Sequence, residues 1–367
     1  MQGTREEFLK KVESIRKLAA EKDAQGILIT RQTNFAWLSC GGRGFVSLAS
    51  EGACASLLVT GAGVWLMSNN IETPRLLAEE MPELEGVLQF YAPPWETLGS
   101  TNADFIAQKA QGVCLTDMQL AAEFAALRGV LCQEEAERYA ELGKEAAQIV
   151  EQICRLLKPG MSELETAGLV SSALWARNIE PITLLVAFDR RTELYRHPLP
   201  TAQTLQKSAL VAVCARRYGL VVSLTRMVSI GAPSDALMQK HRAVVAVDAC
   251  FMGSTVPGAR AGDIFANAVE AYKTTGFADE WRLHHQGGMA GYEAREYIGV
   301  FGCDEIVQCG QAFAWNPSIT GTKSEDTFLV TDHGCRILTH TGEYPYIEVS
   351  YSGGSLLRPD ILVLESQ

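Results

Sequence analysis

A hairpin near the carboxyl end of the chain places two polar side chains where they could share one site. Residues 312–327 read AFAWNPSITGTKSEDT, in which two strand-like runs flank a Gly-Thr-Lys turn. Asn316 lies on one arm and Glu325 on the other. A divalent-metal site needs several carboxylate oxygens, whereas this hairpin supplies one carboxylate and one neutral amide. The pair looks like a metal site with a ligand missing; an Asn that satisfies strand-end backbone is the structural alternative.

Histidines in two other segments could move protons near neutral pH. His197 lies in RHPLP, and His284 and His285 lie in RLHHQGGMAGYEAREY, whose glycines would let the backbone approach a ligand closely. We expect His197 to act as an acid or base, provided that substrate and water lie within hydrogen-bond reach. Tyr292 could donate a hydrogen bond but exchanges protons poorly at pH 7. The alternatives are a surface histidine before a proline and packed core residues.

Arginines in two loops are candidates for binding a substrate carboxylate. Arg43 lies among glycines in FAWLSCGGRGF, and Arg190 precedes a second arginine in FDRRTE. A guanidinium grips a carboxylate through a planar fork that lysine cannot copy. The alternative for both is a solvated loop charge. Arg295 and Glu296 are interpreted most simply as exposed or paired charges.

Composition indicates an ordinary globular protein that acts on small partners. Of 367 residues, 47% are hydrophobic and 20% are charged, and the formal net charge is −11. No stretch gathers several Lys or Arg, so nucleic acid and anionic membranes are not expected as partners. The start lacks the apolar stretch of a signal peptide, and no later segment approaches ~20 uninterrupted apolar residues. We expect a cytoplasmic protein whose partner is a small molecule or short peptide.

The ten cysteines are interpreted as buried thiols. They are scattered through apolar runs such as AVCARR and VDACFM without a CxxC pair. A free cysteine behaves as a small hydrophobic residue in reducing compartments. Cys303 and Cys309 lack a second close Cys/His pair, which argues against a zinc cluster.

The elements expected to position these residues divide the chain into two domains, since single cores stop growing at roughly 250 to 300 residues. The first ~125 residues alternate helical stretches with short strands such as GILIT, ASLLV and GVWLMS. This alternation predicts a small α/β domain. From Cys132 a long amphipathic helix runs to Pro159-Gly160, and a second helix follows with Ser162 as N-cap. The chain then turns β-rich, with helices expected near 233–251 and 261–275.

Several motifs arrive in the order found in the pita-bread family of methionine aminopeptidase, aminopeptidase P, prolidase and creatinase, which this chain resembles. They are KPGMSE, FDRRTELYRHPLPT, GLVVSLTR, HHQGG and SEDTFLVTDHGCRILT. The resemblance implies an α+β fold: a pita-bread domain over residues 129–367, preceded by a smaller creatinase- or prolidase-like α/β domain over residues 1–128. It also implies hydrolysis of a C–N bond.

Family peptidases hold two divalent metal ions with two Asp, one His and two Glu, and this chain departs from that set. By resemblance Ala212 stands at the first Asp position, Ser223 at the second and Asn316 at the first Glu, while His285 and Glu325 match the remaining ligands. Tyr292 stands where many relatives keep a second catalytic His. A neutral Asn or Ser adds little affinity for a divalent ion. We therefore expect no metal cofactor.

The first functional hypothesis is a metal-independent, creatinase-like hydrolase of a C–N bond in a small carboxylated substrate. Creatinase itself works without metal, through a histidine and arginines. His197, His285 and Glu325 would then be catalytic, and Arg43, Arg190, His284, Tyr292 and Asn316 would bind substrate. Creatine itself is not the expected substrate, because Thr225 replaces a creatinase carboxylate. Arg43 resembles a residue that reaches a neighbouring subunit's site, which implies a homodimer.

Two alternatives stay open at this point. One is a non-catalytic protein that binds a peptide or an amino-acid derivative, which Ala212 favours because alanine contributes no chemistry. The other is an aminopeptidase P-like metallopeptidase that holds a single metal such as Mn or Zn on His285 and Glu325.

Overall fold

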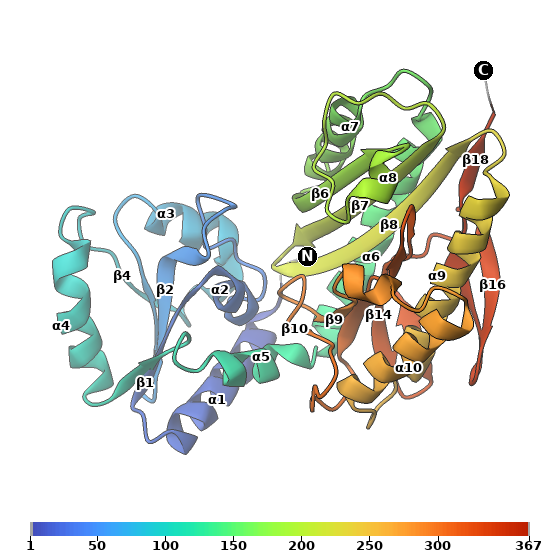
Figure 1. Ribbon diagram of the computed structural model, residues 1–367. Coiled ribbons are helices and arrows are strands. Elements are labelled where there is room, and N and C mark those ends of the chain that lie inside the picture. Colours follow the sequence, from blue (N-terminus) through green and yellow to red (C-terminus); the bar gives the residue numbers. More distant parts are fainter. Residues whose placement is uncertain (1–2, 366–367) are drawn as a thin grey trace. The chain divides into compact units, whose positions relative to one another are not determined.

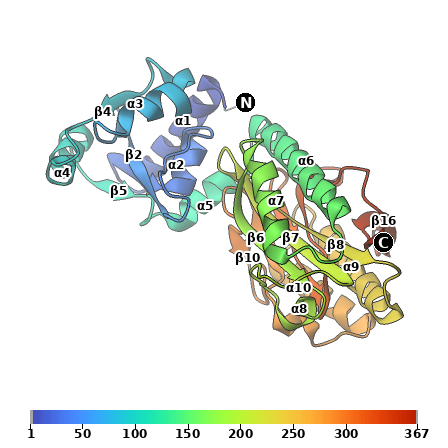
Figure 2. The ribbon, with the colours of Figure 1, turned by 90° about the horizontal axis from the view of Figure 1, so that it is seen from above.

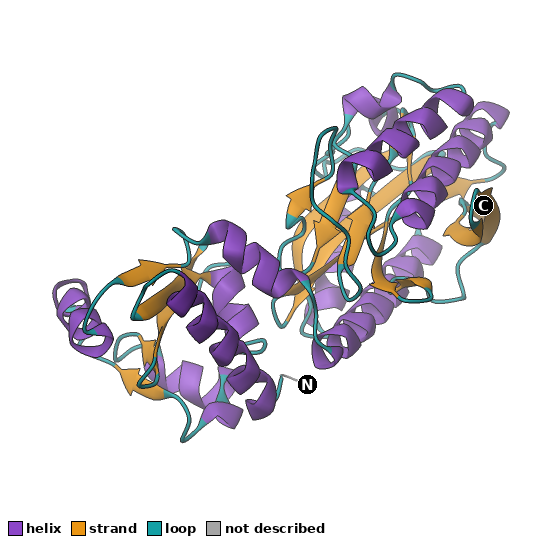
Figure 3. Cartoon of the chain, turned by 90° about the horizontal axis from the view of Figure 1, so that it is seen from below, coloured by secondary structure: helices purple, strands orange, loops and turns teal. Residues whose placement is uncertain are grey.

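The computed structural model describes residues 3–365, and within them the chain forms two compact units. Within the described residues, unit 1 comprises residues 3–129 with the short segment 218–220, and unit 2 comprises residues 130–217 with 221–365. Helices and strands are mixed in both units (Figure 3), in agreement with the predicted α+β class. The expected domain boundary between residues 128 and 129 lies one residue from the end of the first segment of unit 1. The assignment of the units as separate domains stays a prediction.

Unit 1 is built on a five-stranded mixed sheet with the order β4-β3-β2-β1-β5 (Figure 1). Strand β1 runs antiparallel to β2 and parallel to β5, and α1, α2 and α4 pack on the sheet. The predicted strands GILIT, ASLLV and GVWLMS fall in β1, β2 and β3. Its elements are α1 (Arg5–Glu21), β1 (Gly26–Arg31), α2 (Gln32–Leu38), β2 (Gly52–Thr60), β3 (Val64–Met67), α3 (Thr73–Arg75), η1 (Leu76–Glu80), η2 (Pro82–Leu84), β4 (Gln89–Tyr91), α4 (Leu98–Ala110), β5 (Cys114–Thr116) and α5 (Ala121–Gly129).

The first sheet of unit 2 has the order β18-β8-β7-β6, and two long helices cover it. Helix α6 packs on β7 and α7 packs on β6 (Figure 2). As predicted, Ser162 caps α7, through a capping box in which Ser162 and Glu165 each satisfy the other's backbone N–H. The elements are α6 (Gln133–Leu156), α7 (Glu163–Trp175), β6 (Glu180–Phe188), α8 (Arg191–Leu194), β7 (Ser208–Arg217), β8 (Leu220–Ile230) and β18 (Leu362–Leu364).

The second sheet of unit 2 carries the hairpin expected at residues 312–327. Strand β11 pairs with β14 in an antiparallel register that sets Trp315 opposite Asp326, and a short β12–β13 ribbon lies between them in sequence. Asn316 therefore follows β11 directly, and Glu325 directly precedes β14. The elements are β9 (Gly287–Ala290), β10 (Tyr297–Ile298), β11 (Ala312–Trp315), β12 (Ser318–Ile319), β13 (Thr322–Lys323), β14 (Asp326–Thr331) and β15 (Gly334–Ile337).

Two helices and a hairpin complete the core of unit 2. Helix α9 (Asp235–Ser254) contacts β12, β13, β16 (Tyr346–Tyr351) and β17 (Gly354–Pro359), and α10 (Ala261–Thr274) packs on α9. Their apolar faces meet the second sheet, where Phe251 stacks on Trp315 with ring centroids 4.5 Å apart. A further short helix, η3 (Glu280–Leu283), precedes His284. None of the helices described within residues 3–365 is long and apolar enough to cross a membrane.

Candidate functional site

A cavity of about 200 Å³ in unit 2 collects many of the residues singled out from the sequence. Strands β6 and β7 form part of its wall, and the loop after α8, the segments flanking β9 and the β11–β14 hairpin supply the rest. Four of the predicted site residues line it, namely His197, His285, Asn316 and Glu325. The other lining residues are Thr183, Leu185, Ala212, Val213, Cys214, Ala294, Arg295 and Lys323.

The Glu325 carboxylate is held by two side-chain cations. Arg295 Nη2 lies 2.8 Å from Oε1, and Lys323 Nζ lies 2.7 Å from Oε2. Thr225 on β8 donates a third hydrogen bond to Oε2 at 2.7 Å. Glu325 is buried. Burial alone would raise its pKa, but Lys323 and Arg295 outweigh that effect and lower the pKa to about 2. The carboxylate is therefore ionised at neutral pH, and both oxygens accept hydrogen bonds.

The Arg295 guanidinium lies between β8 and the hairpin. Its Nη1 donates to Ser223 Oγ at 3.1 Å while its Nη2 binds Glu325. The side chain is 11% exposed, and its Nε has no hydrogen-bond partner within the described part of the chain. Arg295 and Lys323 each carry a positive charge and Glu325 carries a negative one, so the ion triad of these three residues has a net charge of +1.

Asn316 presents an unused acceptor to the same cavity. The side chain is 3% exposed, and its Oδ1 has no hydrogen-bond partner among residues 3–365. Its backbone N–H donates to the carbonyl of Gln286 at 3.0 Å, so strand-end backbone is satisfied by the main chain. A buried acceptor without a donor costs free energy, and a ligand N–H or a water molecule would remove that cost.

Three histidines gather at the same place. His197 and His284 approach with Nε2 atoms 3.0 Å apart, and the His285 ring centroid lies 4.5 Å from that of His284 and 5.6 Å from that of His197. Burial, with the charge of Lys323, lowers the pKa of His197 below its usual value. Burial, with neighbouring positive charge, lowers the pKa of His284 to about 2 and that of His285 to about 4. All three imidazoles are neutral at pH 7, so each offers a lone pair.

Comparison with known proteins places this site in a family. Residues 137–332, more than half of the chain, match metallopeptidase family M24. This chain belongs to that family. The uncharacterized peptidase YqhT of Bacillus subtilis is 23% identical over 90% of this chain and 98% of its own length. A Xaa-Pro dipeptidase of Pyrococcus furiosus is 24% identical over 54% of this chain and 62% of its own length.

Solved structures confirm the predicted pita-bread fold. A dipeptidase from Pyrococcus horikoshii superposes with a TM-score of 0.74 at 17% identity, covering 96% of this chain and 100% of that one. The N-terminal domain of FACT complex subunit SPT16 from chickpea superposes with a TM-score of 0.65 at 16% identity, covering 92% and 97%. Identities this low establish the fold alone. The M24 fold is thus shared by a dipeptidase and by a subunit of a complex.

The residues that the resemblance sets at the M24 ligand positions do not fit a pair of divalent cations. Ala212, on β7 and 3% exposed, offers no donor atom. Ser223 already accepts a hydrogen bond from Arg295, and Asn316 is neutral. Glu325 supplies the one carboxylate, and both its oxygens are bound by side-chain cations. Two metal ions here would meet two fixed positive charges without the several oxygen ligands that hard cations need.

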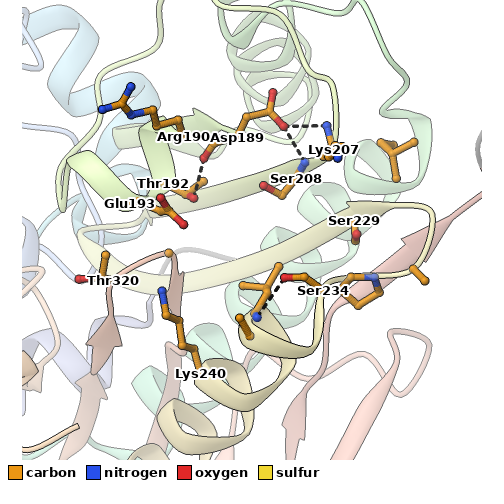
Figure 4. Close-up of a pocket in the computed structure, with 16 residues that line it drawn as sticks. Asp189, Arg190, Thr192, Glu193, Lys207, Ser208, Ser229, Ser234, Lys240 and Thr320 are labelled. Atoms are coloured by element: carbon orange, nitrogen blue, oxygen red, sulfur yellow. Dashed lines mark hydrogen bonds between the residues drawn. The ribbon is translucent and has the colours of Figure 1, made fainter.

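Four predicted substrate-binding residues do not line this cavity. Tyr292 is buried and its hydroxyl donates to Glu135 of α6 at 2.7 Å. Arg190 lines a separate pocket with Asp189, Lys207 and Lys240 (Figure 4). Arg43, in unit 1, pairs with Glu80 at 2.9 Å. His284 touches the cavity residue His197 without lining the cavity itself.

Sequence reasoning missed the two cations that dominate the site. Arg295 was expected as an exposed or paired charge; it is paired with Glu325 across 30 residues and is 11% exposed, but its place in the cavity was not foreseen. Lys323 lies two residues before Glu325, the spacing that puts side chains on one face of an extended segment. The available signal was Lys323, which lies two residues from Glu325 in sequence; no comparable signal marked Arg295.

Proposed function

We propose that this protein is a metal-independent hydrolase of a C–N bond in a small carboxylated substrate. One observation carries the proposal: neutral histidines and fixed side-chain cations share a single cavity of about 200 Å³. General acid/base catalysis needs a group that can take up and return a proton, and a tetrahedral oxyanion needs positive charge nearby. His197 answers the first need, and Arg295 with Lys323 answers the second.

Substrate binding follows from the charge and the unpaired atoms of the cavity. The ion triad of Arg295, Lys323 and Glu325 has net charge +1, which favours a carboxylate or a polarised carbonyl oxygen. The unpartnered Oδ1 of Asn316 is suited to accept a hydrogen bond from a substrate N–H. A molecule that carries both groups, such as an N-substituted amino acid or a short peptide, satisfies both.

The hydrolytic step needs only the chain and water. His197 accepts a proton from water as the water oxygen bonds to the carbon of the scissile C–N bond. The substrate oxygen that gains negative charge faces Arg295 and Lys323. As the C–N bond breaks, the leaving nitrogen takes the proton from His197, so the products are a carboxylic acid and an amine, which exchange a proton to become a carboxylate and an ammonium ion. His284 positions the His197 ring through their 3.0 Å contact, and His285 lines the cavity wall beside it.

Glu325 takes a different role from the catalytic one expected from sequence. A carboxylate base needs an oxygen free to accept a proton at working pH. Both oxygens of Glu325 accept hydrogen bonds, and its pKa is lowered to about 2 by Lys323 and Arg295 despite burial. We therefore assign Glu325 as the group that positions these two cations.

Hydrolysis by metal-stripped protein tests the proposal. The protein is treated with chelator and assayed against N-substituted amino acids and Xaa-Pro dipeptides for release of free amine. We expect turnover by the stripped wild type, and a fall of about 10²- to 10⁴-fold in His197→Gln, the usual contribution of a general base. His333→Gln, at an exposed histidine elsewhere, is the matched control and should keep full activity. Absence of turnover with every substrate, or equal activity in His197→Gln, would refute the proposal.

The second candidate is a binding protein without turnover. Both oxygens of Glu325 are bound by side-chain cations, and Ala212 has no reactive group. Few side chains of the cavity are therefore left to act in catalysis, which supports a binding role. Calorimetric binding of an amino-acid derivative with no amine release over days would favour this candidate. An aminopeptidase P-like reaction through one metal on His285 and Glu325 is the least supported, because Lys323 and Arg295 occupy the carboxylate; stoichiometric metal in purified protein would revive it.

We also propose that the protein works as a homodimer in which Arg43 serves the neighbouring subunit's site. The support is the family resemblance together with the position of Arg43, whose side chain stays 38% exposed while it binds Glu80. Sedimentation would show the oligomer. In a dimer, Arg43→Ala should raise KM for a carboxylated substrate. The change also removes a partner of the buried Glu80 carboxylate, so the free energy of unfolding should fall by about 1–3 kcal/mol.

A further inference from the structure

The three histidines of the cavity have the geometry of a metal-ligand set. One ring nitrogen from each of His197, His284 and His285 falls in a group whose atoms all lie within 4.8 Å of one another. The Nε2 atoms of His197 and His284 are 3.0 Å apart. Two imidazole nitrogens on a tetrahedral zinc ion, each bound at 2.0–2.1 Å, are separated by about 3.3 Å. A small opening of the pair would therefore admit an ion between them.

The donor atoms of the cluster suit a transition metal. Imidazole nitrogens are ligands that Zn, Cu and Ni accept, and the three rings meet at one place. His284 is 8% exposed, and its Nδ1 lacks a hydrogen-bond partner among the residues described. The ion would enter at the Nε2 atoms of His197 and His284, so Nδ1 of His284 is the second nitrogen of that ring and not a ligand atom.

We propose that His197, His284 and His285 form a mononuclear site for Zn²⁺ or a similar imidazole-preferring divalent ion. Imidazole ligands suit Zn, Cu and Ni, whereas Mg, Ca and Mn prefer oxygen. The site differs from the M24 dinuclear centre, because it needs no carboxylate and only His285 stands at an M24 ligand position. Three protein nitrogens leave a fourth position to water, as in zinc sites with three histidines.

The charges near the three histidines, and the lack of a hydrogen-bond acceptor for His284 Nδ1 among the described residues, determine the expected metal affinity. Lys323 acts on all three histidines as an unfavourable charge for a cation, Arg295 does so on His285, and Glu325 acts in the opposite sense. Ligating histidines usually donate their second N–H to a carboxylate or carbonyl, and loss of such a partner weakens affinity by about 10- to 100-fold. The Nδ1 of His284 has no such acceptor in the described chain. We therefore expect a reversible site that is weaker than a structural zinc site.

Occupation of this site would oppose the hydrolysis proposed above. A nitrogen of His197 that donates its lone pair to a metal ion cannot take a proton from water. The ion would act as an inhibitor that competes with the proton-transfer step. Metal binding itself does not rest on hydrolysis, because it is measured without a substrate.

The experiment measures metal binding directly. Chelator-treated protein is titrated with ZnCl₂ by calorimetry and with CoCl₂ by visible absorption, which reports tetrahedral Co²⁺. We expect one ion per chain, with affinity reduced at least 10-fold in His197→Gln and in His285→Gln. Both positions are exposed, so these variants should fold. His284→Gln is added with its thermal unfolding midpoint recorded, since this side chain is buried.

Two controls separate this site from others. His333→Gln, at an exposed histidine outside the cluster, should bind as wild type does. Glu325→Gln removes the one carboxylate at the M24 ligand positions and should weaken binding less than threefold. The proposal is overturned if the wild type binds no ion at millimolar Zn²⁺, if both exposed histidine variants bind as tightly as wild type, or if only Glu325→Gln loses the ion.

Discussion

Glu325 and Asp326 are neighbours in sequence, yet their carboxylates belong to two ion networks of different construction. Glu325 faces the cavity and binds Arg295 and Lys323. Asp326 enters the core, where it binds Arg226 at 3.0 Å and Arg358 at 2.7 Å. Adjacent residues of an extended segment point to opposite faces, so one strand serves both networks.

The core network uses its polar atoms fully. Arg226 also binds Glu151 at 2.9 Å and the Thr339 carbonyl at 2.7 Å, and Arg358 also binds Asp248 at 2.6 Å. Neither arginine is exposed. Around Glu325, by contrast, Asn316 Oδ1 and Arg295 Nε have no partner in the described chain, and an open volume lies beside them. The comparison indicates that the core network holds the fold, while the cavity network keeps capacity for a ligand.

Breaking the core network should have the largest effect on stability. Arg226→Met removes one partner of Glu151 and of Asp326 and leaves buried carboxylates short of positive charge. Loss of one partner from a buried ion pair costs about 3–5 kcal/mol. Urea unfolding should show that loss in the free energy of unfolding. A loss below about 1 kcal/mol would show that the core network does not stabilise the fold more than the cavity network does.

Neutralising Glu325 should cost less, because the cavity offers solvent to the groups left behind. Glu325→Gln leaves Arg295 and Lys323 without their shared counter-ion, and we expect a loss of about 1–3 kcal/mol. Added acetate should restore part of this stability, since a small carboxylate can replace the missing charge. The same acetate series on Arg226→Met is the control and should restore nothing, because no cavity of comparable size adjoins that network among those described.

Acidification should destabilise the folded protein in part through His284. The pKa of His284 is lowered by burial and by Lys323 to about 2 when folded, from an ordinary 6.5. The unfolded chain therefore binds a proton below pH 6.5 that the folded chain refuses, and stability falls as pH falls. Between pH 7 and pH 5 this one group removes up to about 2 kcal/mol.

Two core carboxylates, Glu151 and Asp248, act in the opposite sense over that range, whereas His340, which contacts Asp326, has its pKa lowered by burial and acts as His284 does. Burial raises the pKa values of Glu151 and Asp248, although their arginine partners lower them, so acid does not penalise the folded state through these groups. Urea unfolding at pH 7 and pH 5 should give a smaller pH-dependent loss in His284→Gln than in wild type. Equal losses in the two proteins would assign the acid sensitivity elsewhere.

Removing single hydrogen-bonding groups should give the smallest effects. Asn316→Ala deletes an amide whose Oδ1 has no partner in residues 3–365, so we expect a change within about 0.5 kcal/mol. Thr339→Val is the matched change in the core network. Thr339 Oγ1 donates to Asp326 at 2.7 Å and accepts from the Thr327 N–H at 3.1 Å, and its loss should cost about 1–3 kcal/mol. Ligand binding should weaken only in Asn316→Ala.

The fold was largely predictable from sequence because its signals are local. Alternating apolar runs predicted β1, β2 and β3, and the capping serine and the proline-glycine stop bounded α6 and α7. The hairpin that holds Asn316 and Glu325 was also recognisable, because two strand-like runs flank a turn. The assignment of Ala212, Ser223 and Asn316 to replaced ligand positions stays a prediction. The cavity does contain His197, His285, Asn316 and Glu325 together.

The partners of these residues were not predictable, because they come from distant parts of the chain. Arg295 reaches Glu325 across 30 residues, and His197 meets His284 across 87. Tyr292 follows a strand end, and only the packing of α6 shows that its hydroxyl turns to Glu135. Spacing in a sequence fixes which side chains share a strand face, whereas such pairings depend on how sheets and helices come together.

The pairing of Glu325 with Arg295 and Lys323 also bears on how the site becomes complete after synthesis. A metal centre neutralises its carboxylates only after metal ions have bound, and it competes with other proteins for the metal ions in the cell. In this protein both positive charges are side chains of the chain itself, so the Glu325 carboxylate is neutralised as soon as the chain folds. Starvation for metals or exposure to chelators would leave this carboxylate as well neutralised as before.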